Sequence, residues 1–262
     1  MSSTTVIVTG GGSGLGKAIA TAFLAASYNV AICDVNQERL AATEQEWKSA
    51  GHKADKFLTT TTDVADNASV QKLIDDTVAR FGRLDILVNN AGIMDDFSPV
   101  GECTHEMWNR VLGVNLHGPF NTCTAAVKQF QQQDQPGGLI FNICSIAARL
   151  GHLAGAPYTV SKHGLVGLSK NTAFAYGDKG IYSIAFILGG MNTNIGDAMA
   201  NGINMDFFER FRAAHTPIDA ENPLVVEVEN VAKYIVFVSS DMGIAKGLNG
   251  SSVDLTNNWP EA

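Results

Sequence analysis

Short apolar runs alternate with longer segments of helical period along nearly the whole chain. This alternation restricts the possible folds more than any other feature of the sequence. Three of the runs, LDILVN, LIFNIC and YSIAFIL, are almost continuous in apolar residues, which is typical of central strands covered on both faces. Seven such runs with helices between them predict right-handed βαβ units on a parallel sheet. We therefore expect an α/β fold with a doubly wound, seven-stranded parallel sheet and helices on both faces.

The pattern gives a range for each element. The expected strands are Thr5–Thr9, Asn29–Asp34, Ala54–Thr60, Leu84–Asn89, Leu139–Ser145, Tyr182–Leu188 and Ser251–Thr256. The expected helices are Gly16–Ser27, Gln37–Ala50, Ser69–Phe81, His105–Gln132, Tyr158–Tyr176 and Val228–Ser240. No boundary divides the chain, so residues 1–262 form one predicted domain. The irregular stretch at about 190–223 fits a lid over the substrate better than a linker.

Composition excludes several classes of protein. Apolar residues make up 45% of the 262 residues and charged residues 17%, which is typical of a globular chain. The net charge is −8 and no run is rich in lysine or arginine, so a nucleic-acid partner is not expected. No apolar run reaches the length of a membrane span, and the N-terminal residues lack the pattern of a secretion signal. The four cysteines form no C-x-x-C pair. We expect reduced thiols, no metal site and a cytoplasmic protein.

A glycine-rich turn follows the first expected strand and precedes a helix. Its glycines are spaced Gly10-x3-Gly14-x-Gly16, which differs from the more common G-x-G-x-x-G. Glycine lets the backbone approach a pyrophosphate, and the helix N-terminus supplies free N–H groups and a favourable dipole. A tight turn with no ligand is the alternative. The position at the start of an α/β chain favours a dinucleotide site.

Asp34 ends the second expected strand, 18 residues after Gly16. A carboxylate at this place can accept hydrogen bonds from the adenosine ribose diol, and it repels a 2′-phosphate. No arginine or lysine follows it directly. The alternative is a turn aspartate at a strand end. The sequence favours NAD(H) over NADP(H).

Tyr158 and Lys162 stand four residues apart in a segment of helical period, so they share one helix face. Pro157 just before them suits the first turn of a helix. Taken alone, such a pair is more often solvated surface than an active site. The other motifs decide between these two interpretations.

With these motifs in place, the chain resembles the short-chain dehydrogenase/reductase family over essentially its full length, which implies a Rossmann-type fold. The resemblance rests on Thr9–Gly16, on Asp63-Val64, on Asn89-Asn90-Ala91-Gly92, and on Asn115, Ser145, Tyr158 and Lys162 in that order. The spacing of 13 between Ser145 and Tyr158 is typical of the family. The resemblance implies cofactor contacts from Gly10, Gly12, Ser13, Gly14, Leu15, Gly16, Asp34, Asp63, Val64, Asn90, Ala91, Gly92, Tyr158, Lys162, Gly189 and Thr193.

The resemblance also implies a catalytic role for four residues. Tyr158 is the expected general acid/base, although a phenol with a pKa of about 10 is a poor base near neutrality. Lys162 is expected to lower that pKa by its charge and to bind the nicotinamide ribose. Ser145 is expected to hydrogen-bond the substrate oxygen, and Asn115 to hold a water that links Lys162 to solvent.

Two segments depart from the family pattern. Leu188 replaces the usual proline after the sixth strand. Without the fixed φ of proline, the sequence does not predict the path of the loop beside the nicotinamide. Asn257-Asn258 replaces a Gly-Gly pair near the C-terminus. Asparagine tolerates left-handed backbone better than most residues, so the turn is expected to persist.

Methionine and phenylalanine in and near the lid indicate a partly apolar substrate. The candidate lining residues are Met94, Ala147, Arg149, His152, Met191, Met199, Phe207 and Phe208. Arg149 and His152 either meet a polar group of the substrate or face solvent. Asp95 and Asp96 disfavour a strongly anionic substrate.

The expected activity is NAD(H)-dependent hydride transfer on a secondary alcohol or ketone. A 3-oxoacyl-thioester reductase and a non-catalytic dinucleotide sensor are the alternatives. Asp34 disfavours the first, since such enzymes usually take NADPH, and the intact set of four catalytic residues disfavours the second. The resemblance also implies a homodimer or homotetramer, with the two long helices in the dimer contact.

Overall fold

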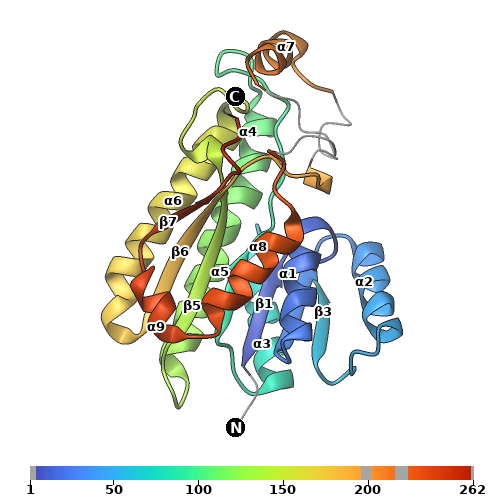
Figure 1. Ribbon diagram of the computed structural model, residues 1–262, viewed down its shortest axis with the longest axis vertical. Coiled ribbons are helices and arrows are strands. Elements are labelled where there is room, and N and C mark those ends of the chain that lie inside the picture. The colour runs from blue at the N-terminus through green and yellow to red at the C-terminus, as the bar shows by residue number, and fades with distance from the viewer. Residues whose placement is uncertain (1–3, 196–201, 216–223, 261–262) are drawn as a thin grey trace.

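One seven-stranded parallel sheet forms the centre of the computed structural model, which describes residues 4–195, 202–215 and 224–260 (Figure 1). The strand order is β3-β2-β1-β4-β5-β6-β7, and all six neighbouring pairs are parallel. The strands are β1 (Thr5–Thr9), β2 (Asn29–Asp34), β3 (Phe57–Thr61), β4 (Ile86–Asn89), β5 (Gly138–Ser145), β6 (Ile181–Leu188) and β7 (Ser252–Leu255). The order reverses between β1 and β4, and doubly wound sheets bind ligands beside such a reversal. The predicted fold class is confirmed.

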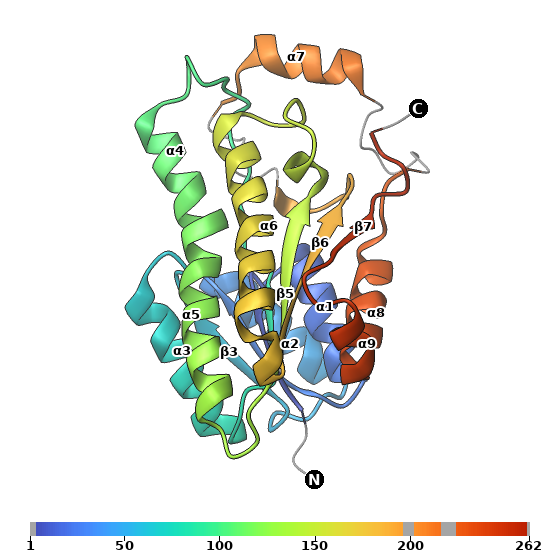
Figure 2. The ribbon, with the colours of Figure 1, turned by 90° about the vertical axis from the view of Figure 1, so that its left-hand side faces the viewer.

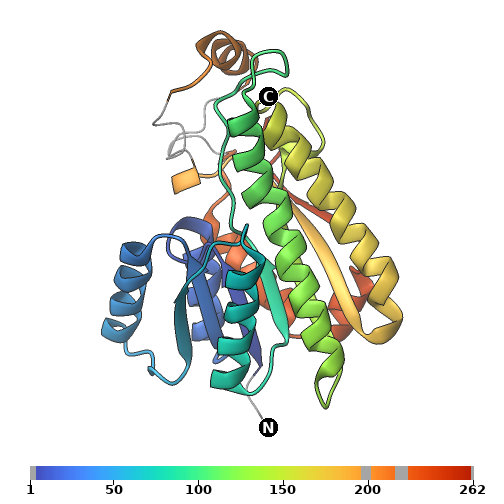
Figure 3. The same cartoon turned by 180° about the vertical axis from the view of Figure 1, so that it is seen from behind.

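Helices cover both faces of the sheet. One face carries α1 (Gly14–Ala25), α2 (Gln37–Ser49) and α8 (Val228–Ser239), and the other carries α3 (Asn67–Phe81), α5 (Gly118–Gln132) and α6 (Ala156–Tyr176), as Figures 1 and 3 show from opposite sides. The remaining helices are α4 (His105–Leu112), α7 (Met205–Ala214) and α9 (Met242–Gly247), with short turns η1 (Gly113–His117), η2 (Ile146–Ala148) and η3 (Gly177–Lys179). None of the helices within the described ranges combines the length and apolarity of a membrane span.

The side chains of β1 show why the sheet needs both layers. Val6 and Val8 pack toward α1 and α8, whereas Ile7 between them packs toward α3 and α5. All three are fully buried. Because successive residues of a strand point to opposite faces, a strand that is apolar at every position is stable only between two layers.

The helix α7 lies apart from both layers. Figure 2 shows it across the end of the molecule where the strands have their carboxyl termini. It falls inside the predicted lid, of which residues 190–195 and 202–215 are described. Asn204 begins it by accepting a hydrogen bond from the Phe207 amide. This helix and α9 were not expected from the sequence.

Other differences from the predicted ranges are local. The third strand begins at Phe57 and not at Ala54, because Lys56 N–H donates to the Lys53 carbonyl and closes a turn first. The predicted helix His105–Gln132 is continuous in space but contains the π-helical turn η1, which carries Asn115. The helix α6 begins at Ala156, with Pro157 in its first turn as expected.

A series of hydrogen-bonded, buried polar side chains runs across β4, β5 and β6 and connects α5 with α6. Thr122 on α5 donates to Asn89, Asn89 donates to Asn142 at 2.9 Å, and Asn142 donates to Ser183 at 3.2 Å. Ser183 in turn hydrogen-bonds Ser169 on α6 at 3.0 Å. Because a buried polar group without a partner is costly, this series favours one arrangement of β4, β5 and β6.

We predict that Asn142→Ala lowers the free energy of unfolding by about 1–3 kcal/mol, because it removes two buried hydrogen bonds of this series. Urea unfolding followed by circular dichroism measures the change. Asn109→Ala, at an exposed position of α4, is the control, with an expected change below about 0.5 kcal/mol. Equal losses in the two variants would contradict a stabilising role for the buried series.

Candidate active site

The glycine turn between β1 and α1 has a backbone that other residues cannot adopt. Gly10 and Gly14 have positive φ of 64° and 51°. A Cβ on Gly16 would lie 2.2 Å from the Gly10 carbonyl oxygen. Ser13 begins α1 without a capping hydrogen bond from its own side chain. Ser13, Gly14, Leu15 and Gly16 at the start of α1 line a groove beside the turn.

Two polar side chains hold this turn against the end of β4. Thr9 Oγ1 accepts hydrogen bonds from the amides of Asn90 and Ala91, both at 3.0 Å. The Asn90 side-chain amide donates to the Thr9 carbonyl at 2.9 Å and to the Gly10 carbonyl at 3.3 Å. The glycine turn and the Asn-Ala-Gly segment are thus fixed relative to each other.

Asp34 at the end of β2 faces the same turn. Its carboxylate accepts hydrogen bonds from the amides of Gly12 at 3.2 Å and Asn36 at 3.0 Å. Arg39 in the first turn of α2 also lines the groove beside Asp34. Arg39 was not expected from the sequence, because it does not directly follow Asp34.

One cavity of about 680 Å³ extends from this turn to the underside of α7. Most of the predicted cofactor residues line it: Gly10, Ser13, Gly14, Leu15, Gly16, Asp34, Asp63, Val64, Asn90, Ala91, Gly92, Tyr158, Lys162, Gly189 and Thr193. Gly12 does not line it and instead packs against Asp34 and Arg39. The structure therefore brings together residues that are up to 183 positions apart, from Gly10 to Thr193.

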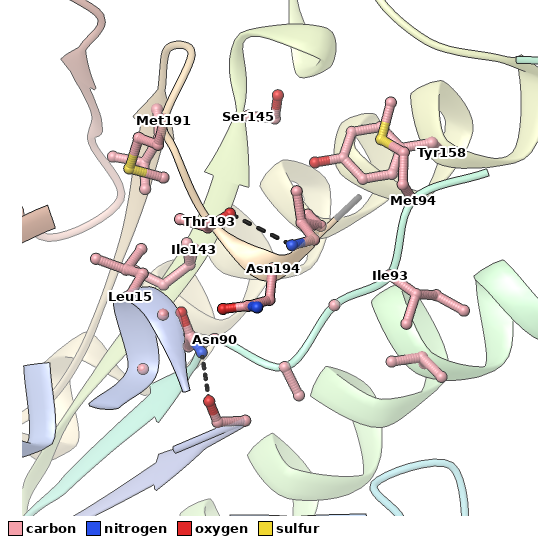
Figure 4. A pocket seen from close by; sticks show the side chains of 18 of the residues that line it. Leu15, Asn90, Ile93, Met94, Ile143, Ser145, Tyr158, Met191, Thr193 and Asn194 are labelled. Atoms are coloured by element: carbon pink, nitrogen blue, oxygen red, sulfur yellow. Dashed lines mark hydrogen bonds between the residues drawn. The ribbon is translucent and has the colours of Figure 1, made fainter. Parts of the chain in front are cut away.

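Ser145, Tyr158 and Lys162 meet in the middle of this cavity. Ser145 ends β5, and its Oγ accepts a hydrogen bond from the Ala147 amide at 3.2 Å. Figure 4 shows the side chains of Tyr158 and Ser145 in the pocket, with Met94 on the Tyr158 side and Met191 across from it. Lys162 Nζ lies 5.5 Å from the centre of the Tyr158 ring and donates to the Ile143 carbonyl at 3.0 Å.

Both titratable groups of this set are almost fully buried. Burial raises the pKa of Tyr158, hydrogen bonding by the Ser145 side chain lowers it, and the charges of Asp95 and Cys144 raise it. Burial also lowers the pKa of Lys162, with Cys144 opposing this shift. The pKa of Tyr158 is thus raised on balance, although Lys162 was expected to lower it. The reason is that removing the phenolate from water dominates.

Asn115 lies behind this set and not in the cavity wall. Its side-chain amide accepts a hydrogen bond from the Ile93 amide at 2.8 Å and donates to the Ile93 carbonyl at 2.9 Å. It also donates to Ser161 at 3.3 Å. Asn115 therefore fixes the segment after Gly92, which passes beside Lys162.

The outer end of the cavity is apolar and largely aromatic. It is lined by Met94, Phe97, Leu153, Met191, Phe208, Phe211 and Trp259, with Arg212 as a cation. Phe97 packs against Phe208 and Phe211 with ring centres 5.0 and 5.4 Å apart. Phe97, Leu153, Phe211 and Trp259 were missed, because no local pattern separates them from ordinary core residues.

The other candidate substrate residues lie outside this lining. Ala147 is buried beneath it, and His152 stacks on His215 with ring centres 5.0 Å apart. Phe207 is half-buried on α7, where Phe208 occupies the position facing the cavity. Arg149 forms an exposed ion pair with Asp254 at 2.8 Å. Met199 falls outside the described residues.

Both departures from the family pattern have a structural consequence. Leu188 extends the pairing of β6, opposite Ser145 on one side and Leu255 on the other. Asn257 and Asn258 adopt positive φ of 48° and 63°, as expected. The turn they form carries Trp259, which is 5% exposed, into the cavity wall.

Comparison with known proteins agrees with this geometry. Residues 4–203 match the family model described as short chain dehydrogenase. The chain belongs to the short-chain dehydrogenase/reductase family.

Relatives in this family cover nearly the whole chain. The chain is 40% identical over 256 residues to the short chain dehydrogenase/reductase dpchG of Colletotrichum higginsianum, covering 97% of this chain and 93% of the relative. It is 36% identical over 255 residues to 3beta-hydroxysteroid dehydrogenase 2 of Eggerthella lenta, covering 97% and 94%. A crystal structure of an actinorhodin polyketide ketoreductase variant with NADPH superposes with a TM-score of 0.82 at 26% identity, covering 99% of this chain and 98% of that one.

Membership in this family makes the chain an oxidoreductase that takes a nicotinamide dinucleotide. The groove fits such a ligand on its own geometry. A Cβ on Gly10 or Gly16 would clash with neighbouring backbone, so only glycine keeps the tight turn that lines the groove at the start of α1, where a pyrophosphate can bind, and Asp34 lines the same groove.

Proposed function

We propose that this protein transfers a hydride between NAD(H) and a secondary alcohol or ketone, with Tyr158 as the general acid/base. The single observation that carries the proposal is that Ser145, Tyr158 and Lys162 line the same cavity as the glycine turn and Asp34. The nicotinamide ring, when bound, supplies or accepts the hydride.

The protein side chains handle the proton and the developing charge. In the oxidation direction, ionised Tyr158 accepts the proton of the substrate hydroxyl, and in reduction the neutral phenol donates it back. The Ser145 hydroxyl donates a hydrogen bond to the substrate oxygen and so stabilises the charge that develops there. Lys162, on the same face of α6, places a cation beside the Tyr158 ring and favours the ionised form.

The raised pKa of Tyr158 gives the pH dependence of each direction. Oxidation requires the ionised tyrosine, so its rate rises as the pH approaches the tyrosine pKa from below. Reduction requires the neutral tyrosine, so its rate is highest below that pKa and falls as the pH rises through it.

We predict that Tyr158→Phe lowers kcat by about 10²–10⁴-fold, because general acid/base catalysis contributes this much. NADH absorbance with NAD⁺ and a panel of secondary alcohols measures turnover, and quenching of NADH fluorescence measures binding, which is retained. Tyr176→Phe on the same helix is the control and keeps full activity. A Tyr158→Phe protein with full activity would contradict the mechanism.

NAD(H) is proposed over NADP(H) because the Asp34 carboxylate stands at the adenosine end of the groove. A 2′-phosphate there meets a like charge. Arg39 beside it is a cation and favours the phosphate.

We predict that the protein binds NADH at least about tenfold more tightly than NADPH, and that Asp34→Asn reduces this preference. The reason is that a hydrogen bond to a charged group is worth about 1.5–3 kcal/mol, or one to two decades in affinity. Fluorescence titration with each dinucleotide measures the two dissociation constants. Asp55→Asn, at an exposed position before β3, is the control and leaves the preference unchanged. Tighter binding of NADPH by the unmodified protein would refute the choice of cofactor.

The substrate is proposed to carry its hydroxyl or keto group on a bulky apolar ring skeleton. Phe97, Phe211 and Trp259 form a wide aromatic wall at the substrate end. Two proteins similar to this chain act, by their names, on a 3β-hydroxysteroid and on a polyketide. Asp95 and Asp96 do not line the cavity, so they do not set the charge of the substrate.

We predict that a 3β-hydroxysteroid is oxidised with a kcat/KM about 10²-fold above that of butan-2-ol, because each 100 Å² of additional apolar surface buried contributes about 2.5 kcal/mol. Phe211→Ala lowers kcat/KM for the steroid and leaves that for butan-2-ol nearly unchanged. Phe237→Ala on α8, where the ring is 56% exposed and lies outside the cavity lining, is the control. Equal kcat/KM for the two alcohols would rule out the ring-skeleton class.

A homodimer or homotetramer is proposed on the apolar surface of the two long helices. Phe120 on α5 is 57% exposed and Phe174 on α6 is 92% exposed. Large apolar side chains at such exposure favour burial against a second copy of the chain.

A further inference from the structure

The helix that carries Tyr158 and Lys162 begins without a capping side chain of its own. Its N-cap residue is Gly155, whereas Asn36, Asp66 and Thr104 cap α2, α3 and α4 through their own side chains. The first amides of a helix have no partner within the helix and need an acceptor. For α6 this acceptor comes from a residue 60 positions earlier in the chain, Asp95.

The Asp95 carboxylate is held by three backbone amides. Oδ1 accepts from Gly155 at 3.0 Å and from Phe97 at 3.0 Å, and Oδ2 accepts from the amide of Tyr158 itself at 3.0 Å. The side chain is 1% exposed. Amide donors replace the water that a buried carboxylate loses, and a helix N-terminus favours a negative charge.

The fit between Asp95 and α6 leaves no free space. A Cβ on Gly155 would lie 2.7 Å from Oδ2 and 2.9 Å from Oδ1 of Asp95. The Ala156 amide also donates to the Ser98 carbonyl at 3.0 Å. The segment 95–98 and the first turn of α6 therefore form one rigid contact.

Helix α7 also packs against the segment 95–98. Phe97 has a positive φ of 62°, which is strained for a bulky residue, and its amide is one of the three bound to Asp95. Its ring packs on Phe208 of α7. The Asn204 amide at the start of α7 donates to the Asp96 carbonyl at 2.7 Å.

We propose that Asp95 is a positioning residue, which fixes the backbone of Tyr158 and couples the catalytic helix α6 to α7 over the substrate end. Nothing of Asp95 lines the cavity, so it acts through Tyr158 and Phe97 and touches no ligand. The kinetic part of this role rests on the proposed function of Tyr158, and the structural part does not.

The proposed role of Asp95 has a second measurable consequence, which is an effect of its charge on the pKa of Tyr158. The charge of Asp95 raises the pKa of Tyr158. The other titratable groups that face Tyr158 are Lys162 on α6 and Cys144 on β5, and those that face Asp95 are Asp96 and Cys103. Removing the Asp95 charge while keeping its shape therefore lowers the pKa of Tyr158, which a purely structural contact would not do.

Asp95→Asn and Asp95→Ala test the proposal, with Asp96→Asn as the matched control. Asp96 is the next residue and binds the Ser98 amide at 3.1 Å in the same manner, but it makes no side-chain hydrogen bond to α6 within the described residues. Hydrogen–deuterium exchange of the full-length chain, resolved at the Gly155 and Tyr158 amides, is the first measurement. Exchange is expected to be about tenfold faster or more in Asp95→Ala and intermediate in Asp95→Asn, since a hydrogen bond to a charged acceptor is worth about a decade or more. Asp96→Asn leaves it unchanged.

The second measurement is kcat against pH for NADH formation from NAD⁺ and a 3β-hydroxysteroid. Asp95→Asn is expected to lower kcat by about tenfold to a hundredfold through misplacement of Tyr158, with KM for NAD⁺ within about twofold. The rise of kcat with pH moves to lower pH in Asp95→Asn and stays in place in Asp96→Asn.

Unchanged exchange at both amides in Asp95→Ala, or a pH profile of Asp95→Asn identical to that of the unmodified protein, would overturn the proposal. If the unmodified protein oxidises no alcohol, the proposed function fails, and the exchange measurement still decides whether Asp95 holds α6. A loss of kcat of the same size in Asp96→Asn would assign the effect to the loop as a whole and would also overturn the proposal.

Discussion

The parallel pairing of β1, β4, β5 and β6 is the constraint on which the rest of the molecule depends. Residue pairs such as Asn89 with Asn142 and Ser145 with Leu188 fix how far each strand reaches. Because the strands run in one direction, their carboxyl ends lie at one edge, and the chain leaves each of them at nearly the same height. The glycine turn, the Asn-Ala-Gly segment, Ser145 and Gly189 all follow from that edge, and together they line one cavity.

Burial gives this edge its chemical character. Tyr158 and Lys162 are 6% and 4% exposed, so their charged forms are poorly solvated and depend on neighbouring groups. The same holds for Asp95, which is stabilised by backbone amides where water is absent. Polar groups in such surroundings are stable only in a defined arrangement, and this is how the fold keeps the positions of Tyr158, Lys162 and Asp95 fixed.

Much of the fold could be predicted because its signals are local. Strand and helix ends agreed with the structure to within three residues, with the largest difference at the start of β3, since apolar periodicity reflects which side chains face the two helix layers. The helices α7 and α9 escaped prediction because they are short, and α7 packs on a loop far away in the chain. The left-handed turn at Asn257 was expected from the residue type, but its effect on Trp259 was not.

The sequence by itself determined the doubly wound sheet, the glycine turn, the acid at the end of β2, and the Tyr158–Lys162 pair on one helix face. Each of these depends on residues close together in the chain, whose geometry is set by backbone stereochemistry and helix or strand period. Only the tertiary structure decided that Phe97, Phe211 and Trp259 line one end of the cavity, that Arg39 stands beside Asp34, and that Asp95 caps α6. These contacts join segments that are distant along the chain, apart from the nearby Arg39–Asp34 pair. They depend on the packing of α7 and the loops around it, which no local pattern of residues specifies.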